Sequence, residues 1–373
     1  MKYGFPSGSI DKKEVKKIGI LRANALGDFI VTLPAIQSLS HFFPNAEIIL
    51  LGKEWHKFFL EEKNEGGLKR TCINRVIVIP VMNGLREEPG MTENSIEVES
   101  FFTSIKKENF DLVISFQGKG NAAIPFLKRL NSKYTIGLSC EDSDQPDCSL
   151  SFHYYQSELI RYLEVASLAG APLYLSPPKI NLFQRDYSEA KDFLNANNIK
   201  NRFIAIHTCG KDIRRMWTKE KFSDLSKLLV NSGFIVILTG SEEDKKYNDE
   251  IVNMSGIDIY NSSGKFSIGG LAALYNISSL VISIDTGALH VAIAAQAKTV
   301  GLYWAPNLIN WAPLTREKHR PVIGWDIKCS VCGIAPVDPY PFEPHTEKCQ
   351  HQQSFIESIS VEEVYKAAMT LTR

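Results

Sequence analysis

The residues best suited to chemistry stand where an apolar segment ends. Residues 280–295 read LVISIDTGALHVAIAA, where an apolar run predicts a buried strand that passes through Asp285-Thr286-Gly287 into a helix. Thr286 suits the helix N-cap, and Gly287 lacks a Cβ, so a ligand can approach the unpaired amides of the first turn. These features predict a diphosphate site. Asp285 would repel phosphate, so its expected partner is a sugar hydroxyl, and His290 lies on the same helical face as Thr286. The alternative interpretation is an ordinary strand-turn-helix with a capping threonine and a packed histidine.

A second junction of this kind lies near the N-terminus. Residues 16–39, KKIGILRANALGDFIVTLPAIQSL, place Arg22, Asn24, Gly27 and Asp28 between a short apolar strand and an amphipathic helix. Ligands of open α/β sheets collect at the carboxyl ends of strands, so we expect Asp28 to project into a cleft opposite the diphosphate site. Asp28 could also serve as a helix cap. Two such junctions in two halves predict two facing domains.

A basic loop follows another predicted strand, 203–207, in the segment FIAIHTCGKDIRRMWTKEKF. The loop and the first turn of the helix opened by Thr218 carry five cations: Lys211, Arg214, Arg215, Lys219 and Lys221. Such a cluster at the end of a strand suits anion binding through charge-assisted hydrogen bonds, although a solvated basic face would have the same composition.

Acidic residues follow the next strand, GFIVILTG. Glu242, Glu243 and Asp244 stand at a helix start, where acids are stabilised by the helix dipole. We expect Glu242 to cap the helix and either Asp244 or Glu243 to contact a ribose, as acids do in dinucleotide folds.

The elements that position these residues alternate between strands and helices, which indicates βα units and parallel sheets. Strands are expected near 17–22, 47–52, 74–80, 112–116 and 134–138, and near 203–207, 233–239, 257–260, 280–284 and 298–303. We place domains at 1–175 and 181–357, with a proline-containing linker over 171–180. A terminal helix with a capping box formed by Ser360 and Glu363 completes the chain.

Composition narrows the function classes. The 373 residues contain 42 Lys plus Arg and 42 Asp plus Glu, and this zero net charge argues against a nucleic-acid binder. No apolar leader or run of ~18 apolar residues is present, so we expect a cytoplasmic protein, with peripheral contact at the inner membrane left open. Seven scattered cysteines predict reduced thiols.

Three segments, LRANALGDFIVTLPAI, HTCGKDIRRMWTKEKF and SIDTGALHVAIAA, resemble the ADP-heptose:lipopolysaccharide heptosyltransferases, family nine of the glycosyltransferases. The resemblance covers almost the whole chain. It implies an α/β fold with two facing Rossmann-like domains of the GT-B type, the donor in the second and the acceptor in the first. It also implies that a C-terminal helix, 358–373, packs back on the first domain.

The resemblance implies an inverting, metal-independent transfer of heptose from ADP-heptose to an acceptor hydroxyl, most naturally in the lipopolysaccharide inner core. Asp28 matches the general base of the family. The expected donor-binding residues are Thr208, Lys211, Arg215, Asp244, Asp285, Thr286, Gly287 and His290, and the expected acceptor-binding residues are Arg22, Asn24, Lys53 and Lys119. Leu289 and Arg215 depart from the pattern, since members often have Ser and Lys there.

A cysteine cluster near the C-terminus has the spacing of a metal finger. Cys329 and Cys332 form a C-x-x-C, and sixteen residues separate Cys332 from Cys349. His345, His351 and Asp338 are the candidates for a fourth ligand. The cluster resembles the cysteine finger of heptosyltransferases that modify bacterial autotransporter proteins, in which four cysteines hold iron. We expect either a structural Zn or Fe or a metal-free thiol cluster, and no cofactor required for catalysis.

Other functions stay open at this stage. The acceptor could be a protein or a small molecule, and the chain could bind a nucleotide sugar without catalysis. The aspartate at position 28 argues against a pure binding protein, and the lack of a strand followed by G-x-G-x-x-G argues against a dehydrogenase.

Overall fold

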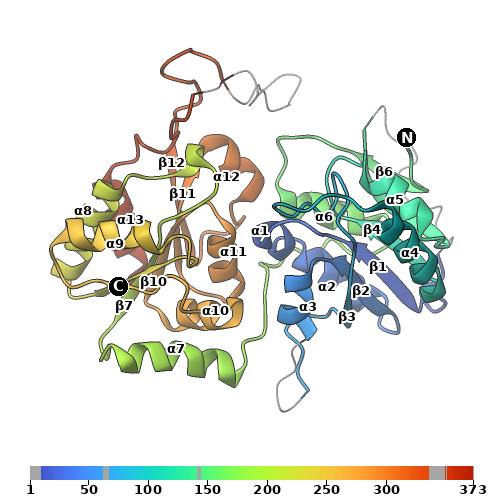
Figure 1. Ribbon diagram of the computed structural model, residues 1–373, viewed down its shortest axis with the longest axis horizontal. Coiled ribbons are helices and arrows are strands. Elements are labelled where there is room, and N and C mark those ends of the chain that lie inside the picture. The colour runs from blue at the N-terminus through green and yellow to red at the C-terminus, as the bar shows by residue number, and fades with distance from the viewer. Residues whose placement is uncertain (1–9, 62–66, 141–143, 336–348, 350, 373) are drawn as a thin grey trace. The chain divides into compact units, whose positions relative to one another are not determined.

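The computed structural model describes residues 10–61, 67–140, 144–335, 349 and 351–372. The chain divides into two compact units (Figure 1). The first contains residues up to His153 and Glu158–Asn181, and the second contains Tyr154–Ser157 and everything from Leu182. The division lies next to the predicted linker, but the linker itself belongs to the first unit. Ala171 and Ile180 are buried there.

The first unit contains one six-stranded parallel sheet, in the order β3-β2-β1-β4-β5-β6. The strands are β1 Lys17–Leu21, β2 Glu47–Gly52, β3 Arg75–Val78, β4 Leu112–Ser115, β5 Tyr134–Ser139 and β6 Cys148–Ser151. The helices are α1 Leu26–Ile30, α2 Leu33–Phe42, α3 Glu54–Glu61, α4 Ser95–Ile105, η1 Lys106–Glu108, α5 Ala123–Arg129 and α6 Glu158–Ser167.

The second unit repeats this arrangement, with the order β12-β11-β10-β7-β8-β9 and parallel pairing throughout. Its strands are β7 Phe203–His207, β8 Ile235–Thr239, β9 Tyr260–Asn261, β10 Leu280–Ile284, β11 Thr299–Trp304 and β12 His319–Gly324. Its helices are α7 Gln184–Ala196, η2 Ile213–Arg215, α8 Lys219–Asn231, α9 Lys245–Ser255, α10 Ile268–Ile277, α11 Gly287–Ala294, α12 Ala305–Trp311 and α13 Val361–Thr372.

Both sheets have the strand order of the Rossmann fold, so each has one point where the order of strands reverses. That point lies between β1 and β4 in the first unit and between β7 and β10 in the second. The central strands are apolar and buried on both faces, as in Leu280–Ile284, because helices cover a parallel sheet on both sides. Ligands of such folds bind at the carboxyl ends of the strands at the reversal point.

Nine of the ten predicted strands are confirmed, and the one predicted at 257–260 is the two-residue β9, which shares only Tyr260 with the prediction. β6 and β12 were not predicted. β6 is a short edge strand in which serines alternate with Cys148 and Leu150, and β12 contains His319, Arg320 and Pro321. Neither has the long apolar run by which the other strands were predicted, and both pair only through one neighbour at a sheet edge. These two strands can therefore be identified only from their pairing with the neighbouring strand.

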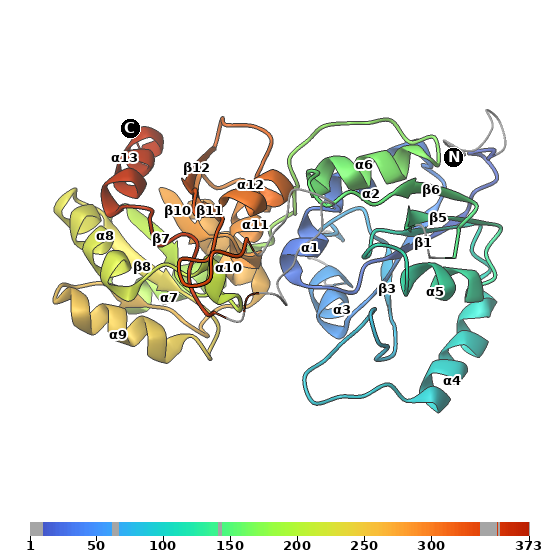
Figure 2. The ribbon, with the colours of Figure 1, turned by 90° about the horizontal axis from the view of Figure 1, so that it is seen from above.

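The C-terminal helix differs from the expectation. Its capping box is confirmed, since Ser360 N donates to Glu363 Oε2 at 2.8 Å and Glu363 N to Ser360 Oγ at 3.3 Å. However, α13 belongs to the second unit and packs beside α8, as Figure 2 shows. Val364, Ala368 and Leu371 join the apolar core of that unit, so the helix packs as part of the second domain. No helix among the described residues has both the length and the apolar character needed to cross a membrane.

Candidate active site

The Asp285-Thr286-Gly287 junction lies at the strand reversal point of the second unit, between β10 and α11. Thr286 is the N-cap residue of α11, but its side chain makes no capping hydrogen bond. Its Oγ1 is buried and has no partner among the described residues. The amides of Gly287 and Ala288 belong to the first helical turn, where no carbonyl of the helix can accept from them. The junction therefore offers unused donors to an anion.

Asp285 is only 1% exposed, and its carboxylate is held by neighbouring side chains. Arg215 Nη1 lies 3.4 Å from Asp285 Oδ2 and donates to the Asp285 carbonyl at 3.1 Å. Asn307 Nδ2, from α12, donates to the same Oδ2 at 2.8 Å. His290 Nε2 lies 3.9 Å from Oδ1. Asp285 therefore holds Arg215 beside the start of α11. The sequence did not predict this role for Asp285.

The five cations of the basic loop have different surroundings. Arg214 is clamped by Asp212, with Nε and Nη2 donating at 2.8 and 2.7 Å. Burial would raise the pKa of Asp212, but the hydrogen bonds from Arg214 lower it below its usual value. Lys219 is paired with Glu250, and Lys221 Nζ donates to the carbonyls of Glu357 and Ile359.

The other two cations of the loop lie beside the Asp285-Thr286-Gly287 junction. Arg215 keeps 30% of its side chain exposed, and Lys211 is exposed with no ion pair in the described part of the chain. The loop also lies close to the junction, because a Cβ on Gly210 would lie 3.0 Å from Thr286 Cγ2. Arg215, through its contact with Asp285, and Lys211, next to Gly210, are therefore the cations of the loop that we expect to meet an anion bound at the junction.

Two other expected donor residues have structural partners. Thr208 is fully buried, and its hydroxyl donates to Asn248 Oδ1 at 2.5 Å. Asp244 Oδ2 accepts from Ser241 N and Oγ at 2.7 and 2.8 Å, so Asp244 makes the turn before α9. Asp244, one of the two acids expected to contact a ribose, thus has a local structural partner. Glu242 and Glu243 are both exposed at this strand end, and Glu242 lies against Gly264.

Asp28 lies at the reversal point of the first unit, in the first turn of α1. Its Oδ2 accepts from Ala25 N at 3.3 Å, so it also serves the helix start, and 25% of its side chain is exposed. Arg22 Nη2 lies 3.5 Å from Asp28 Oδ1. Arg22, which was expected to contact the acceptor, is only 2% exposed and makes its contacts within the first unit.

The remaining expected acceptor residues lie in three places. Lys53 follows β2, pairs with Glu88 Oε1 at 3.4 Å and donates to the Glu87 carbonyl at 2.9 Å. Lys119 follows β4, with Nζ 5.4 Å from the Phe152 ring centroid. Asn24 is half-buried in the loop before α1. Asn24 is thus the nearest of them to Asp28 in the chain.

Comparison with known proteins identifies the family. A model of glycosyltransferase family 9 (heptosyltransferase) matches residues 98–332, more than half of the chain. The chain belongs to this glycosyltransferase family. It is 23% identical over 300 residues to lipopolysaccharide heptosyltransferase 3 of Escherichia coli K12, which covers 78% of this chain and 83% of that protein.

Two solved structures confirm the fold of this family 9 chain. One is a family 9 glycosyltransferase from Veillonella parvula, with a TM-score of 0.74, 20% identity and coverage of 96% of this chain and 97% of that one. The other is the iron-containing dodecameric glycosyltransferase TibC from enterotoxigenic E. coli, with a TM-score of 0.52, 11% identity and coverage of 96% and 76%. The GT-B-like architecture expected from the sequence is thereby confirmed.

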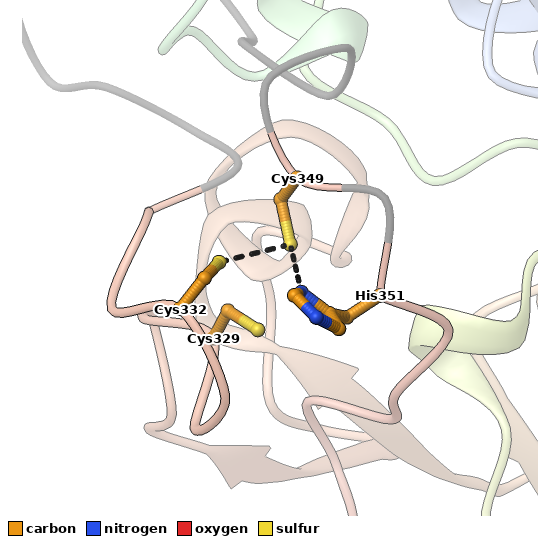
Figure 3. A group of neighbouring side chains, drawn as sticks. All are labelled: Cys329, Cys332, Cys349 and His351. Carbon is orange, nitrogen blue, oxygen red and sulfur yellow. Dashed lines mark hydrogen bonds between the residues drawn. The ribbon is translucent and has the colours of Figure 1, made fainter.

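The cysteine cluster is brought together in this family 9 chain. Cys329, Cys332, Cys349 and His351 place one ligand atom each within 4.8 Å of one another (Figure 3). Cys332 Sγ and Cys349 Sγ are 3.6 Å apart, and His351 Nδ1 lies 3.8 Å from Cys349 Sγ. Burial would raise the pKa of Cys329, but the amides of Cys332 and Val331 lower it to about 7. Of the three expected fourth ligands, His351 lies here, whereas His345 and Asp338 are outside the described residues.

Proposed function

We propose that this chain transfers a heptosyl group from ADP-heptose to a hydroxyl of the lipopolysaccharide inner core, with inversion at the anomeric carbon. The observation that carries the proposal is the anion site at the β10–α11 junction, where Arg215 and the free amides of the first turn of α11 lie together. The named relative, a lipopolysaccharide heptosyltransferase, supports the choice of sugar and acceptor.

The donor diphosphate would lie against Arg215, Lys211, the Thr286 hydroxyl and the amides of Gly287 and Ala288. As the glycosidic bond breaks, negative charge grows on the leaving diphosphate. Preorganised donors stabilise such charge at no cost of reorganisation. These groups suffice for the leaving group, so we propose that transfer needs no divalent cation.

Asp28 would act as the general base on the acceptor hydroxyl. A single displacement with one base inverts the anomeric centre and needs no covalent enzyme intermediate. The carboxylate is suited to this because it is partly exposed and is held by Arg22 and by the amide of Ala25. General-base assistance of this kind contributes roughly 10²–10⁴-fold to the rate.

We also propose that Cys329, Cys332, Cys349 and His351 hold a structural metal ion. Tetrahedral sites with metal–sulfur bonds of ~2.3 Å place neighbouring ligand atoms ~3.8 Å apart, which fits the separations in this cluster. Three cysteines and one histidine form an ordinary structural zinc set. The similarity in fold to an iron-containing glycosyltransferase makes iron the second candidate.

The presence of the finger favours one alternative acceptor, a protein hydroxyl, because the cluster resembles that of heptosyltransferases that modify autotransporter proteins. Transfer assays with ADP-heptose and either lipopolysaccharide core or a serine-rich autotransporter peptide distinguish the two. Heptosylation of the core with inverted configuration, measured by NMR, is the expected result. Product from the peptide alone would replace the proposed acceptor.

The matched variant for catalysis is Asp28→Asn. We expect its affinity for ADP, measured by calorimetry, to stay within about twofold, because the donor residues belong to the other unit. Turnover should fall by at least ~10²-fold. Turnover equal to that of the unmodified enzyme would remove Asp28 from the mechanism, and the lack of ADP binding in both proteins would contradict the donor site.

A further inference from the structure

All three nitrogens of the Arg22 guanidinium contact groups inside the first unit. Nε donates to the Asp28 carbonyl at 3.2 Å, Nη2 lies 3.5 Å from Asp28 Oδ1, and Nη1 donates to the Phe116 carbonyl at the end of β4. The guanidinium carbon lies 5.0 Å from the centroid of the Tyr162 ring. With 2% exposure, no face of this cation is left for a substrate.

Helix α6 supplies the opposite side of this arrangement. Tyr162 and Glu158 are one helical turn apart, are buried, and hydrogen-bond to each other through their side chains. Arg161 Nη2 lies 3.4 Å from Glu158 Oε1. Burial raises the pKa of Glu158, although Arg161 and Arg22 oppose this change. Arg22 is thus enclosed by Asp28, the end of β4 and an aromatic-acid pair from α6.

The helix that carries Asp28 has little stability of its own. α1 contains only five residues, and isolated helices of this length do not persist in water. Arg22 contacts both the main chain and the carboxylate of Asp28, so it restrains the position of the residue and the direction of its side chain. Such a double restraint matters for catalysis, because a misplacement of ~1 Å can cost about 10²-fold in rate.

We infer that Arg22 is a positioning residue for Asp28, held in place by Tyr162 and Glu158, and that it does not bind the acceptor. The inference rests on the proposed role of Asp28 as base. In this interpretation Arg22 does not contact the substrate. It connects the ends of β1 and β4 and the start of α6 to the reacting carboxylate.

The test compares Arg22→Met and Arg22→Lys by steady-state kinetics with ADP-heptose and the acceptor. We expect Arg22→Met to reduce kcat by about 10²-fold, with the KM for the acceptor and the affinity for ADP within about threefold. Arg22→Lys should recover about tenfold of the lost turnover, since the ammonium can reach one of the two Asp28 contacts. A raised acceptor KM with unchanged kcat, in either variant, would overturn the inference.

Two controls separate this inference from its alternatives. Arg75 lies in the same unit, at the start of β3, and pairs with Glu47 and Glu108, so Arg75→Met reports the effect of losing a half-buried ion pair that does not involve Asp28, with kcat expected within twofold. If Arg22→Met does not fold, Arg22→Lys serves as the test, and the same comparison of its kcat and its KM for the acceptor decides the outcome. Asp28→Asn isolates the underlying proposal: if that variant keeps full turnover, the assignment of the base fails, whereas loss in Asp28→Asn with full turnover in Arg22→Met rejects only the positioning role.

Discussion

Two neighbouring arginines at the donor junction differ in what holds them. Arg214 makes two short bonds to Asp212, and its guanidinium lies 5.9 Å from the centroid of the Trp304 ring. Arg215 Nε also lies 3.5 Å from Asp212 Oδ2, but its Nη1 reaches Asp285 at the start of the α11 junction. Both cations have the same charge and comparable exposure, so the difference between them is one of direction.

This difference predicts unequal effects of the same substitution. Arg215→Met should weaken ADP binding by about 10- to 150-fold, because a charge-assisted hydrogen bond contributes about 1.5–3 kcal/mol. Arg214→Met, the matched control, should change the ADP dissociation constant by less than about threefold. Isothermal titration calorimetry with ADP measures both values. Equal losses in the two variants would contradict the special position of Arg215.

At the scale of elements, the segment 353–359 connects the cysteine finger to the basic loop. Gln353 Oε1 accepts from Ser330 N and Oγ within the finger. Phe355 N then donates to the Arg214 carbonyl at 2.9 Å, and the Phe355 ring stacks on Trp304 with centroids 4.6 Å apart. A metal at the finger would therefore fix one end of a segment that supports the donor loop.

Loss of the metal should lower the stability of the second unit. We expect Cys332→Ser to abolish bound metal, measured by elemental analysis, and to lower the melting temperature by about 5 °C or more, because metal binding contributes to folding free energy. Cys72→Ser, outside the finger, should keep both the metal and the melting temperature. A chelator should act on stability in the same way, while initial transfer rates at 25 °C persist without added Mg²⁺. An immediate loss of turnover that Mg²⁺ restores would show that a cation assists the leaving group.

At the scale of the whole molecule, both units bury histidines, and His56 in the first unit and His319 in the second have the most strongly lowered pKa values. Burial is the main reason that the pKa values of His56 and His319 are lowered to about 3. His56 lies in the first unit, where its Nε2 has no partner among the described residues, and His319 lies in the second, beside Thr299 and Tyr303. In the unfolded chain both would titrate near 6.5.

Acid should therefore destabilise both units in the same range of pH. Above pH 6.5 each histidine is neutral in both states, and its contribution to stability is complete. Below pH 6.5 each histidine becomes protonated in the unfolded chain but stays neutral in the folded chain. Each histidine therefore lowers the free energy of unfolding by about 1.4 kcal/mol per pH unit, down to about pH 3. Urea unfolding at pH 7.5 and 5.5 measures this loss. His319→Gln should reduce it for the second unit, whereas the exposed His41→Gln should leave it unchanged.

Sequence alone determined the elements whose pattern is local. The apolar runs of β1 and β10, the capping pair Ser360 and Glu363, and the two junctions at Asp28 and Asp285 follow from residues that are near one another in the chain. The family resemblance and the parallel architecture also follow from them. Interactions within a few residues decide these features, so periodicity and spacing suffice to predict them.

Only the tertiary structure decided which polar groups are already engaged. The partners of Arg22, Asp285, Thr208 and Cys349 come from distant segments or from across a loop, as when Asn307 reaches Asp285 or Tyr162 covers Arg22. Burial and charge pairing depend on which segments meet in space, and no local pattern encodes that. The same reason applies to β6, β12 and α13, because each is defined by the surface against which it packs.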